Sequence, residues 1–301
     1  MSIRPVKKIL KAQPTVEGAG VSLRRAIGFG DPAEVDPFLL LDDFRNENPE
    51  DYLAGFPWHP HRGIETITYV LAGSVEHGDS MGNIGVISSG DIQWMTAGSG
   101  IIHQEMPKGD MKGRMHGFQL WANLPSALKM TSPRYQEIKS VDIPEIIDTD
   151  GTIIRLICGE FWNKKGPVEG IAANPVYIDV TIPGGKKKSL PIDTRNNAFA
   201  YIIDGSGKFC DASEPLAVPT ESVGWLDTHP PLESDNRSLI LFDSGDEVTI
   251  QAGDEGVRFL LISGRPFNEP VAWYGPIVMN TQSELIKAFE ELQKGTFIKN
   301  Q

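Results

Sequence analysis

Two pairs of side chains in the first half of the chain have the residue types and spacing of metal ligands. His59 and His61 stand two residues apart in the stretch Phe56–Glu65, and His103 and Glu105 stand two residues apart further along. Side chains two apart on a β-strand point to the same face of the sheet, so each pair projects in one direction. If the two pairs face each other across a barrel, three imidazoles and one carboxylate meet at one site.

A ligand set of three nitrogens and one oxygen leaves positions of an octahedral metal open for water, substrate or dioxygen. Imidazole and carboxylate suit Fe(II), Mn(II), Ni(II), Cu(II) and Zn(II), and ligand identity alone does not choose among these metals. The two cysteines, Cys158 and Cys210, are too few and too far apart for a structural zinc cluster. The alternative interpretation is that the histidines are ordinary hydrogen-bonded core or loop residues, with His103 and Glu105 in a surface loop.

The elements that must position these residues have the periodicity of short β-strands. Gly, Pro, Asp and Asn separate runs that are rich in β-branched and aromatic residues. The predicted strands include Glu65–Leu71, Ile84–Ile87, Ile153–Ile157, Val176–Ile182, Ser238–Phe242 and Val257–Ile262. Many short strands with frequent turns indicate a sandwich or a barrel.

The end of the chain has the pattern of a helix. Thr281–Glu284 has the spacing of a capping box, and Gly295 can end the helix. One face of this helix is apolar and comprises Leu285, Ala288, Phe289 and Leu292. This face is expected to dock on the β-sheets.

An internal repeat indicates two domains. Tyr69–Ser74 corresponds to Tyr201–Ser206, and Asp91–Trp94 corresponds to Ser222–Trp225, at an offset of about 132 residues. The region between the two copies is rich in Pro, Ser and charge. The sequence therefore predicts a first barrel over residues 1–130, a linker over residues 131–145, and a second barrel with the terminal helix over residues 146–301.

The repeat also allows a comparison within one chain. The positions that match His59, His61 and Glu65 are Pro191, Asp193 and Asn197. The second half therefore keeps the strand pattern without the histidines. Because the scaffold does not require them, the metal interpretation is favoured over the interpretation as core or loop residues.

Composition excludes several classes of function. The formal net charge of −12 and the isoelectric point near 5 argue against direct binding of nucleic acid or of an anionic membrane. No apolar run approaches the roughly 20 residues of a membrane span, and residues 1–13 lack the apolar stretch of a secretion signal. Few cysteines fit a reducing compartment. We therefore expect a cytoplasmic protein, with the nucleus as a further location in a eukaryote.

Several stretches, in order, resemble the pirin family of the cupin superfamily: Phe56–Thr66, Gly90–Gly98, Gly100–Pro107, His116–Pro125 and Tyr274–Thr281. The resemblance implies an all-β fold of two cupin (jelly-roll) barrels in tandem with a C-terminal helix. It implies iron in the first barrel, bound by the residues His59, His61, His103 and Glu105. The second barrel, which lacks these ligands, is expected to hold no metal.

The remaining polar residues near these stretches receive other expectations. Glu65 is expected to orient a ligand or cap a turn rather than bind the metal. His116 is expected to be a strand residue near the cavity, and His77 and His229 are expected to be exposed in turns.

The resemblance implies an oxygenase that opens the ring of flavonols such as quercetin, with a flavonol-like aromatic substrate and dioxygen. In that reaction Glu105 would accept the proton of the flavonol 3-hydroxyl. The alternative is a regulatory protein without turnover, in which the metal senses redox state and the partner is a transcription factor or a metabolic enzyme. Oxygen consumption separates the two classes, because only an enzyme consumes oxygen over many turnovers.

Overall fold

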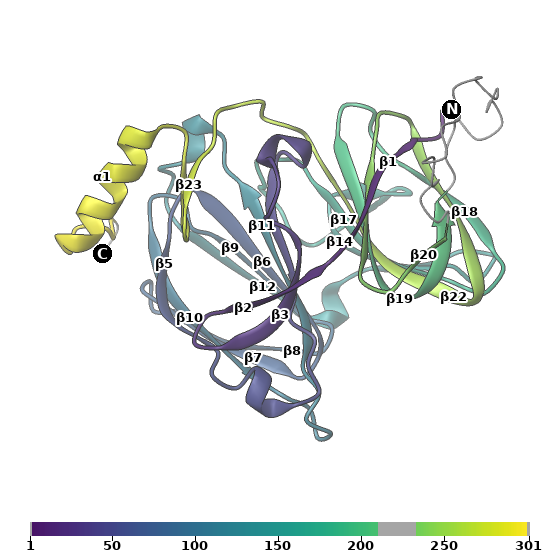
Figure 1. The fold of residues 1–301 in the computed structure, drawn as a ribbon, viewed down its shortest axis with the longest axis horizontal. Helices are drawn as coiled ribbons and strands as arrows, with labels where there is room; N and C mark the ends of the chain where they lie inside the picture. Colours follow the sequence, from purple (N-terminus) through teal and green to yellow (C-terminus); the bar gives the residue numbers. More distant parts are fainter. Residues whose placement is uncertain (1, 210–232, 300–301) are drawn as a thin grey trace, which may run out of the picture. The chain divides into compact units, whose positions relative to one another are not determined.

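The computed structural model describes residues 2–209 and 233–299 of the chain. These residues form two compact units. The first barrel comprises Gln13–Ile143, Pro167–Asn174 and the chain from Phe267 onward; the second barrel comprises the chain up to Ala12, Pro144–Gly166 and Pro175–Pro266. Both units consist of antiparallel β-strands, and the α-helix of the described residues lies near the C-terminus (Figure 1). The predicted all-β cupin fold with a C-terminal helix is confirmed.

The first barrel contains two antiparallel sheets that enclose the candidate site. The seven-stranded sheet has the order β12-β9-β6-β11-β4-β3-β2, with β2 (Gln13–Glu17), β3 (Val21–Ile27), β4 (Phe38–Asp43), β6 (Ile64–Ala72), β9 (Ile92–Thr96), β11 (His116–Asn123) and β12 (Arg134–Ile138). The four-stranded sheet has the order β5-β10-β7-β8, with β5 (Phe56–His61), β7 (Ser74–Asp79), β8 (Ile84–Ser88) and β10 (Ile101–Lys108). Short 3₁₀ turns lie at Pro32–Glu34, Pro49–Asp51, Ser126–Leu128 and Ser140–Asp142.

Strand β10 shows how the sequence sets the interior of this barrel. Burial alternates along it, and Ile101, His103, Glu105 and Pro107 are the buried set. A strand with a period of two that packs one face on a core has this pattern. His103 and Glu105 therefore lie on the same buried face, as predicted.

The second barrel has a nine-stranded sheet. Its strands are β1 (Val6–Lys11), β13 (Glu145–Ile147), β14 (Ile153–Cys158), β17 (Val176–Ile182), β18 (Lys187–Pro191), β19 (Asn197–Phe209), β20 (Glu233–Asp235), β21 (Ser238–Phe242) and β22 (Glu247–Gly264). A two-stranded ribbon pairs β15 (Glu160–Phe161) with β16 (Lys164–Lys165). Large apolar side chains such as Leu190, Ile202 and Phe259 fill the core of the second barrel.

The internal repeat can be followed in the described part of both barrels. Tyr69 on β6 and Tyr201 on β19 are both fully buried. Asp193, the counterpart of His61, forms an ion pair with Arg195 (2.6 Å). The repeat partner Ser222–Trp225, together with Cys210 and His229, lies outside the described residues.

Each end of the chain belongs to a different barrel from the one that was predicted for it. Strand β1 pairs with β21 and belongs to the second barrel, although the prediction placed residues 1–130 in the first. The segment from Phe267 onward belongs to the first barrel, although the prediction placed residues 146–301 in the second. The predicted linker, residues 131–145, contains β12, an edge strand paired with β9. Local periodicity identifies a strand but carries no information about its distant partner.

The C-terminal segment consists of the ribbon β23 (Ala272–Tyr274) and β24 (Ile277–Met279), followed by α1 (Gln282–Gln293). The predicted capping box is present: the Thr281 hydroxyl accepts from the Glu284 amide, and the Glu284 carboxylate accepts from the Thr281 amide (2.9 Å). Leu285 and Ala288 are buried against this ribbon. No helix of the described residues has the length and apolar character to span a membrane.

Candidate metal centre and cavity

Strand pairing brings the two predicted ligand pairs together. In the antiparallel pair of β5 and β10, His59 lies opposite His103, and His61 lies opposite Ile101. A register shift follows His103, so that Glu105 lies opposite Phe56. Such an irregularity redirects side chains next to it. The histidine pair and His103 therefore meet, while Glu105 is displaced along the sheet.

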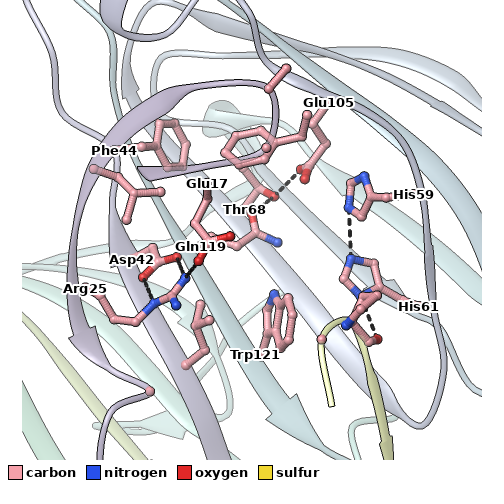
Figure 2. A pocket seen from close by; sticks show the side chains of 18 of the residues that line it. Glu17, Arg25, Asp42, Phe44, His59, His61, Thr68, Glu105, Gln119 and Trp121 are labelled. Atoms are coloured by element: carbon pink, nitrogen blue, oxygen red, sulfur yellow. Dashed lines mark hydrogen bonds and ion pairs between the residues drawn. The ribbon is translucent and has the colours of Figure 1, made fainter. Parts of the chain in front are cut away.

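The three imidazoles form a compact group. His59, His61 and His103 each offer a ring nitrogen, and these nitrogens lie within 4.8 Å of one another. The Nε2 atoms of His59 and His61 are 3.0 Å apart (Figure 2). The ring centroids of His59 and His103 are 4.3 Å apart. This convergence of ring nitrogens is the arrangement that a bound transition metal requires.

Backbone carbonyl groups set the orientation of two of the rings. Nδ1 of His59 lies 2.9 Å from the carbonyl oxygen of Pro57, and Nδ1 of His61 lies 3.1 Å from that of Pro276. When Nδ1–H donates to these carbonyls, Nε2 is left with a lone pair. Metal-binding histidines commonly have their other ring nitrogen held in this way. Both rings thus leave Nε2 available as a potential ligand.

His103 gives an independent test of whether a metal fits. Its side chain is fully buried, and neither ring nitrogen has a hydrogen-bond partner among the described residues. Buried polar atoms without a partner are rare because they cost free energy, and a metal ion would satisfy one of these nitrogens. Burial, with the neighbouring histidines, lowers the pKa of His103 well below its ordinary value and lowers that of His61 to about 3. His61 and His103 are therefore held in the neutral form, which is the form that binds a metal.

Glu105 lies beside this group but points to another partner. Its carboxylate accepts a hydrogen bond from the Thr68 hydroxyl (2.8 Å), and the side chain is buried. Among the described residues, the side chains close enough together to hold one metal ion are the three histidines, and Glu105 is not one of them. The prediction that Glu105 is a fourth ligand therefore stays a prediction.

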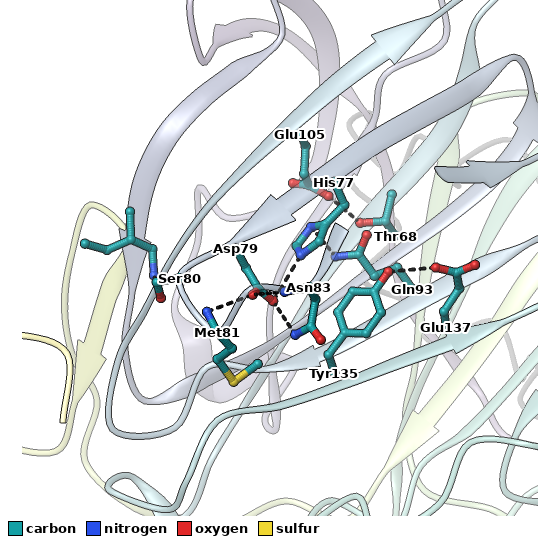
Figure 3. A network of polar contacts seen from close by, with 11 residues as sticks. Thr68, His77, Asp79, Ser80, Met81, Asn83, Gln93, Glu105, Tyr135 and Glu137 are labelled. Atoms are coloured by element: carbon teal, nitrogen blue, oxygen red, sulfur yellow. Dashed lines mark hydrogen bonds and ion pairs between the residues drawn. The ribbon is translucent and has the colours of Figure 1, made fainter. Parts of the chain in front are cut away.

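His77 is a buried residue beside this site whose position the sequence analysis missed. It was expected to be exposed, and this expectation is wrong: its side chain is completely buried on β7. Nε2 of His77 lies 3.3 Å from Asp79, and Gln93 contacts Nδ1 at 2.9 Å (Figure 3). The ring centroid of His77 is 5.4 Å from that of His103. The available signal was the spacing of two residues from Val75 to His77 to Asp79, which places all three on the interior face of β7.

The C-terminal segment also contributes to the site, which the sequence pattern did not indicate. Two buried cations hold it on the barrel. Arg62 donates to the carbonyl groups of Ser99 (2.7 Å) and Phe297 (2.8 Å) and to Glu291 (2.8 Å). These contacts fix the segment that carries Pro276, the carbonyl partner of His61.

Lys129 is the second of these cations. Its ammonium donates to Gly63 (2.8 Å) and to Val278 on β24 (3.0 Å), and burial lowers its pKa to about 7. Gly63 has a positive φ of 78°, and a Cβ at this position would lie 1.9 Å from the Val278 oxygen. Only glycine allows β24 to approach the turn between β5 and β6 this closely.

A cavity of about 680 Å³ opens from the histidines into the first barrel. This volume lies in the range of small-molecule binding sites. Its walls are largely apolar, with polar groups at defined positions (Figure 2). The lining includes His59, His61, Thr68, Glu105, Gln119, Trp121, Leu40, Asp42, Phe44, Leu23, Arg25, Trp273 and Tyr274. The site therefore has room for an organic ligand next to the imidazoles.

Glu65 lies away from the cavity side of its strand. It is three residues from Thr68 on β6, so the two side chains point to opposite faces. The Thr96 hydroxyl donates to one carboxyl oxygen of Glu65 (2.7 Å), and the other has no partner among the described residues. Burial raises the pKa of Glu65 to about 7, against the opposing effect of the Thr96 hydrogen bond. Glu65 is a buried acid outside the group of imidazoles.

Glu65→Gln is expected to remove a pH dependence of folding. The ordinary pKa of 4.5 applies in the unfolded chain and about 7 in the folded chain, so folding takes up a proton between these values. Wild-type stability therefore falls as the pH rises from 4.5 through 7, by on the order of 3 kcal/mol relative to the variant. Urea unfolding of both proteins at about pH 5 and pH 8 measures this difference. A difference independent of pH would contradict the pKa of Glu65.

His116 begins β11 outside this cavity. Its Nε2 lies 3.7 Å from Asp43, and its ring packs on Phe118 with centroids 5.1 Å apart. His116 is not part of the group of imidazoles found among the described residues. This histidine serves below as a matched control.

The chain is similar to known proteins over both barrels. The family model described as Pirin matches residues 20–122, and the one described as Pirin C-terminal cupin domain matches residues 177–298. A pirin-like protein of Caulobacter vibrioides is 43% identical, covering 99% of this chain and 100% of its own. A pirin-like protein of Solanum lycopersicum is 42% identical, covering 96% and 91%. The crystal structure of a quercetin 2,3-dioxygenase from Acinetobacter baumannii has a TM-score of 0.85 and 30% identity, covering 98% and 99%.

Proposed function

Because the chain belongs to the pirin family, we propose that it is an iron-dependent dioxygenase that opens the ring of flavonols such as quercetin. The observation that carries this proposal is the convergence of three imidazoles at a cavity of about 680 Å³. The similarity to a quercetin 2,3-dioxygenase of known structure supports the choice of substrate.

Three imidazoles with Glu105 as a further oxygen ligand fit a redox-active metal such as iron(II), which would supply open positions where substrate and dioxygen meet. The protein contributes the rest of the environment. Trp121 and Tyr274 line the cavity with aromatic surface, which favours a flat ring system.

Glu105 is the proposed base. It lines the cavity, and its hydrogen bond from Thr68 holds the carboxylate in position. A flavonol whose 3-hydroxyl enters beside the imidazoles would transfer its proton to this carboxylate. Deprotonation of the hydroxyl makes the ring electron-rich and prepares it for attack by dioxygen.

Protein loaded with iron(II) and mixed with quercetin in air is expected to consume oxygen and release carbon monoxide over many turnovers. Holding both reactants at one site contributes about 7 kcal/mol, which iron in solution does not supply. His59→Ala should abolish both signals, because it removes one of the converging nitrogens. An oxygen electrode and a carbon monoxide assay provide the measurement.

The matched control for this experiment is His116→Gln, which changes a histidine outside the group of imidazoles and should leave turnover unchanged. The absence of oxygen uptake with any flavonol would contradict the proposal. In that case a difference between the iron(II) and iron(III) forms in binding a protein partner would support the regulatory alternative.

A further inference from the structure

A row of polar side chains crosses four neighbouring strands on the floor of the cavity. Thr68 on β6 lies opposite Gln119 on β11, Gln119 lies opposite Asp42 on β4, and Asp42 lies opposite Arg25 on β3. Residues directly opposite each other in paired strands point to the same face. All four line the cavity (Figure 2). We call Thr68, Gln119, Asp42 and Arg25 the polar row.

The polar row begins at the proposed catalytic end of the cavity and ends far from it. Thr68 donates to Glu105, so this end touches the proposed base. Arg25 lies three strands away from Thr68 in the same sheet. Neighbouring strands are about 4.8 Å apart, so the row is about 14 Å long. A ligand with one end at Glu105 could therefore reach Arg25 only if it is extended.

The distal end is a largely buried ion pair. Nε and Nη2 of Arg25 donate to the two carboxylate oxygens of Asp42, both at 2.8 Å, and Glu17 lies 2.8 Å from Nη2. The exposed fractions of the Arg25 and Asp42 side chains are 14% and 7%. Nη1 of Arg25 makes no hydrogen bond with a described residue. Its N–H groups remain as donors for a ligand in the cavity.

The middle of the row has spare hydrogen-bonding capacity as well. The Thr68 hydroxyl has one proton, yet oxygens of Glu105 and Gln119 lie 2.8 and 2.7 Å from it. If the Gln119 amide is turned, its nitrogen donates to Thr68 and Thr68 donates to Glu105, which satisfies all three groups. The Gln119 oxygen is then available as an acceptor beside the cavity.

Apolar side chains flank the row on both sides. Trp121 and Leu40 lie opposite each other, each two residues from a member of the row. Phe44 and Leu23 lie two residues from Asp42 and Arg25 in the other direction along the sheet. All four line the cavity. A polar strip between two apolar strips matches a flat aromatic ligand that carries hydroxyl groups.

We propose that the polar row is the specificity element of the cavity, and that the Arg25–Asp42 pair binds the ring hydroxyls of a polyphenol that lie farthest from the histidines. Asp42 accepts from a phenolic hydroxyl, and Nη1 of Arg25 donates to a phenolic oxygen. The inference rests on the proposed function, because it takes a flavonol with its 3-hydroxyl at Glu105 as the ligand.

The test compares two ligands and two proteins at equilibrium. Quercetin and 3-hydroxyflavone share the ring core and the 3-hydroxyl, but only quercetin carries outer hydroxyls. The protein is loaded with zinc(II) and kept without oxygen, which prevents turnover. Titration with each ligand then gives its dissociation constant. The wild type should bind quercetin at least about tenfold more tightly than 3-hydroxyflavone, because a hydrogen bond to a charged group contributes an affinity difference of this size.

The variant Arg25→Met/Asp42→Leu replaces the ion pair as a unit, which avoids a buried charge without its partner. Its preference for quercetin should fall to about one, while 3-hydroxyflavone affinity stays within about threefold of wild type. Retained 3-hydroxyflavone binding also shows that the variant is folded. The matched control is Arg258→Met/Asp179→Leu, which removes a similar two-point ion pair (3.0 and 2.6 Å) in the second barrel and should keep the preference.

The inference is overturned if the wild type binds neither flavonol, if it shows no preference for quercetin, or if the cavity variant keeps that preference. Turnover is measured separately on iron-loaded protein. A lost preference in the variant without any turnover would support the polar row and contradict the dioxygenase. Turnover together with a retained preference would contradict the polar row alone.

Discussion

His103→Ala is expected to lower the bound transition metal from about one per chain to less than about a tenth, because three converging ligands become two. His103 faces the other two imidazoles from the neighbouring strand, so no other residue of the group can replace it. The strand fold should remain, because the second barrel forms the same kind of sheet with apolar side chains in its core. Metal analysis after purification without oxygen measures the metal content, and far-ultraviolet circular dichroism measures whether the strand fold remains.

The matched control is His116→Ala, which removes a histidine outside the group and should keep the metal. His61→Ala should repeat the loss seen with His103→Ala. A metal content near two per chain would show a second site, and full metal content in His103→Ala would show that the metal is held elsewhere. Global unfolding of the variant would show that the scaffold depends on this histidine.

Most of the architecture could be predicted because it depends on local patterns. The alternation along Ile101–Pro107 fixes the buried face of β10, and Thr281 with Glu284 fixes the start of α1. The two-residue spacing within each pair of candidate ligands likewise fixes a common face. The comparison of His61 with Asp193 indicates that the barrel fold does not require a histidine at this position.

The missing information concerns partners that are distant in the sequence. Strand β1 completes the second barrel by pairing with β21, more than two hundred residues away. The carbonyl of Pro276 reaches His61 from the C-terminal segment, which contacts of Arg62 and Lys129 help to hold on the first barrel. Neither contact leaves a periodic signal, since periodicity describes one strand at a time.

The polar row shows the same limit. Thr68, Gln119, Asp42 and Arg25 lie on four strands whose order in the sheet is not their order in the sequence. Each looks like an ordinary polar residue at one strand position. Only the register of three strand pairs places them side by side and gives the cavity a polar strip.

Glu105→Gln is expected to separate metal binding from chemistry. The three imidazoles remain, so the variant should still hold iron(II) when the metal is in excess, although more weakly if Glu105 is a ligand. Flavonol turnover should fall by about 10²-fold or more, because a neutral amide cannot accept the proton of the 3-hydroxyl. Metal content and oxygen uptake, measured on the same samples, give the two quantities.

Glutamine is a close match in shape and can still accept from Thr68, so a loss of turnover reports on the charge and basicity of the carboxylate rather than on packing. Glu76→Gln is the matched control, because Glu76 on β7 is paired with the exposed Lys108 outside the cavity lining and its change should leave turnover intact. A Glu105→Gln protein that keeps full metal content and full flavonol oxidation would exclude Glu105 as base and as essential ligand. Proton transfer would then have to use another group that lines the cavity.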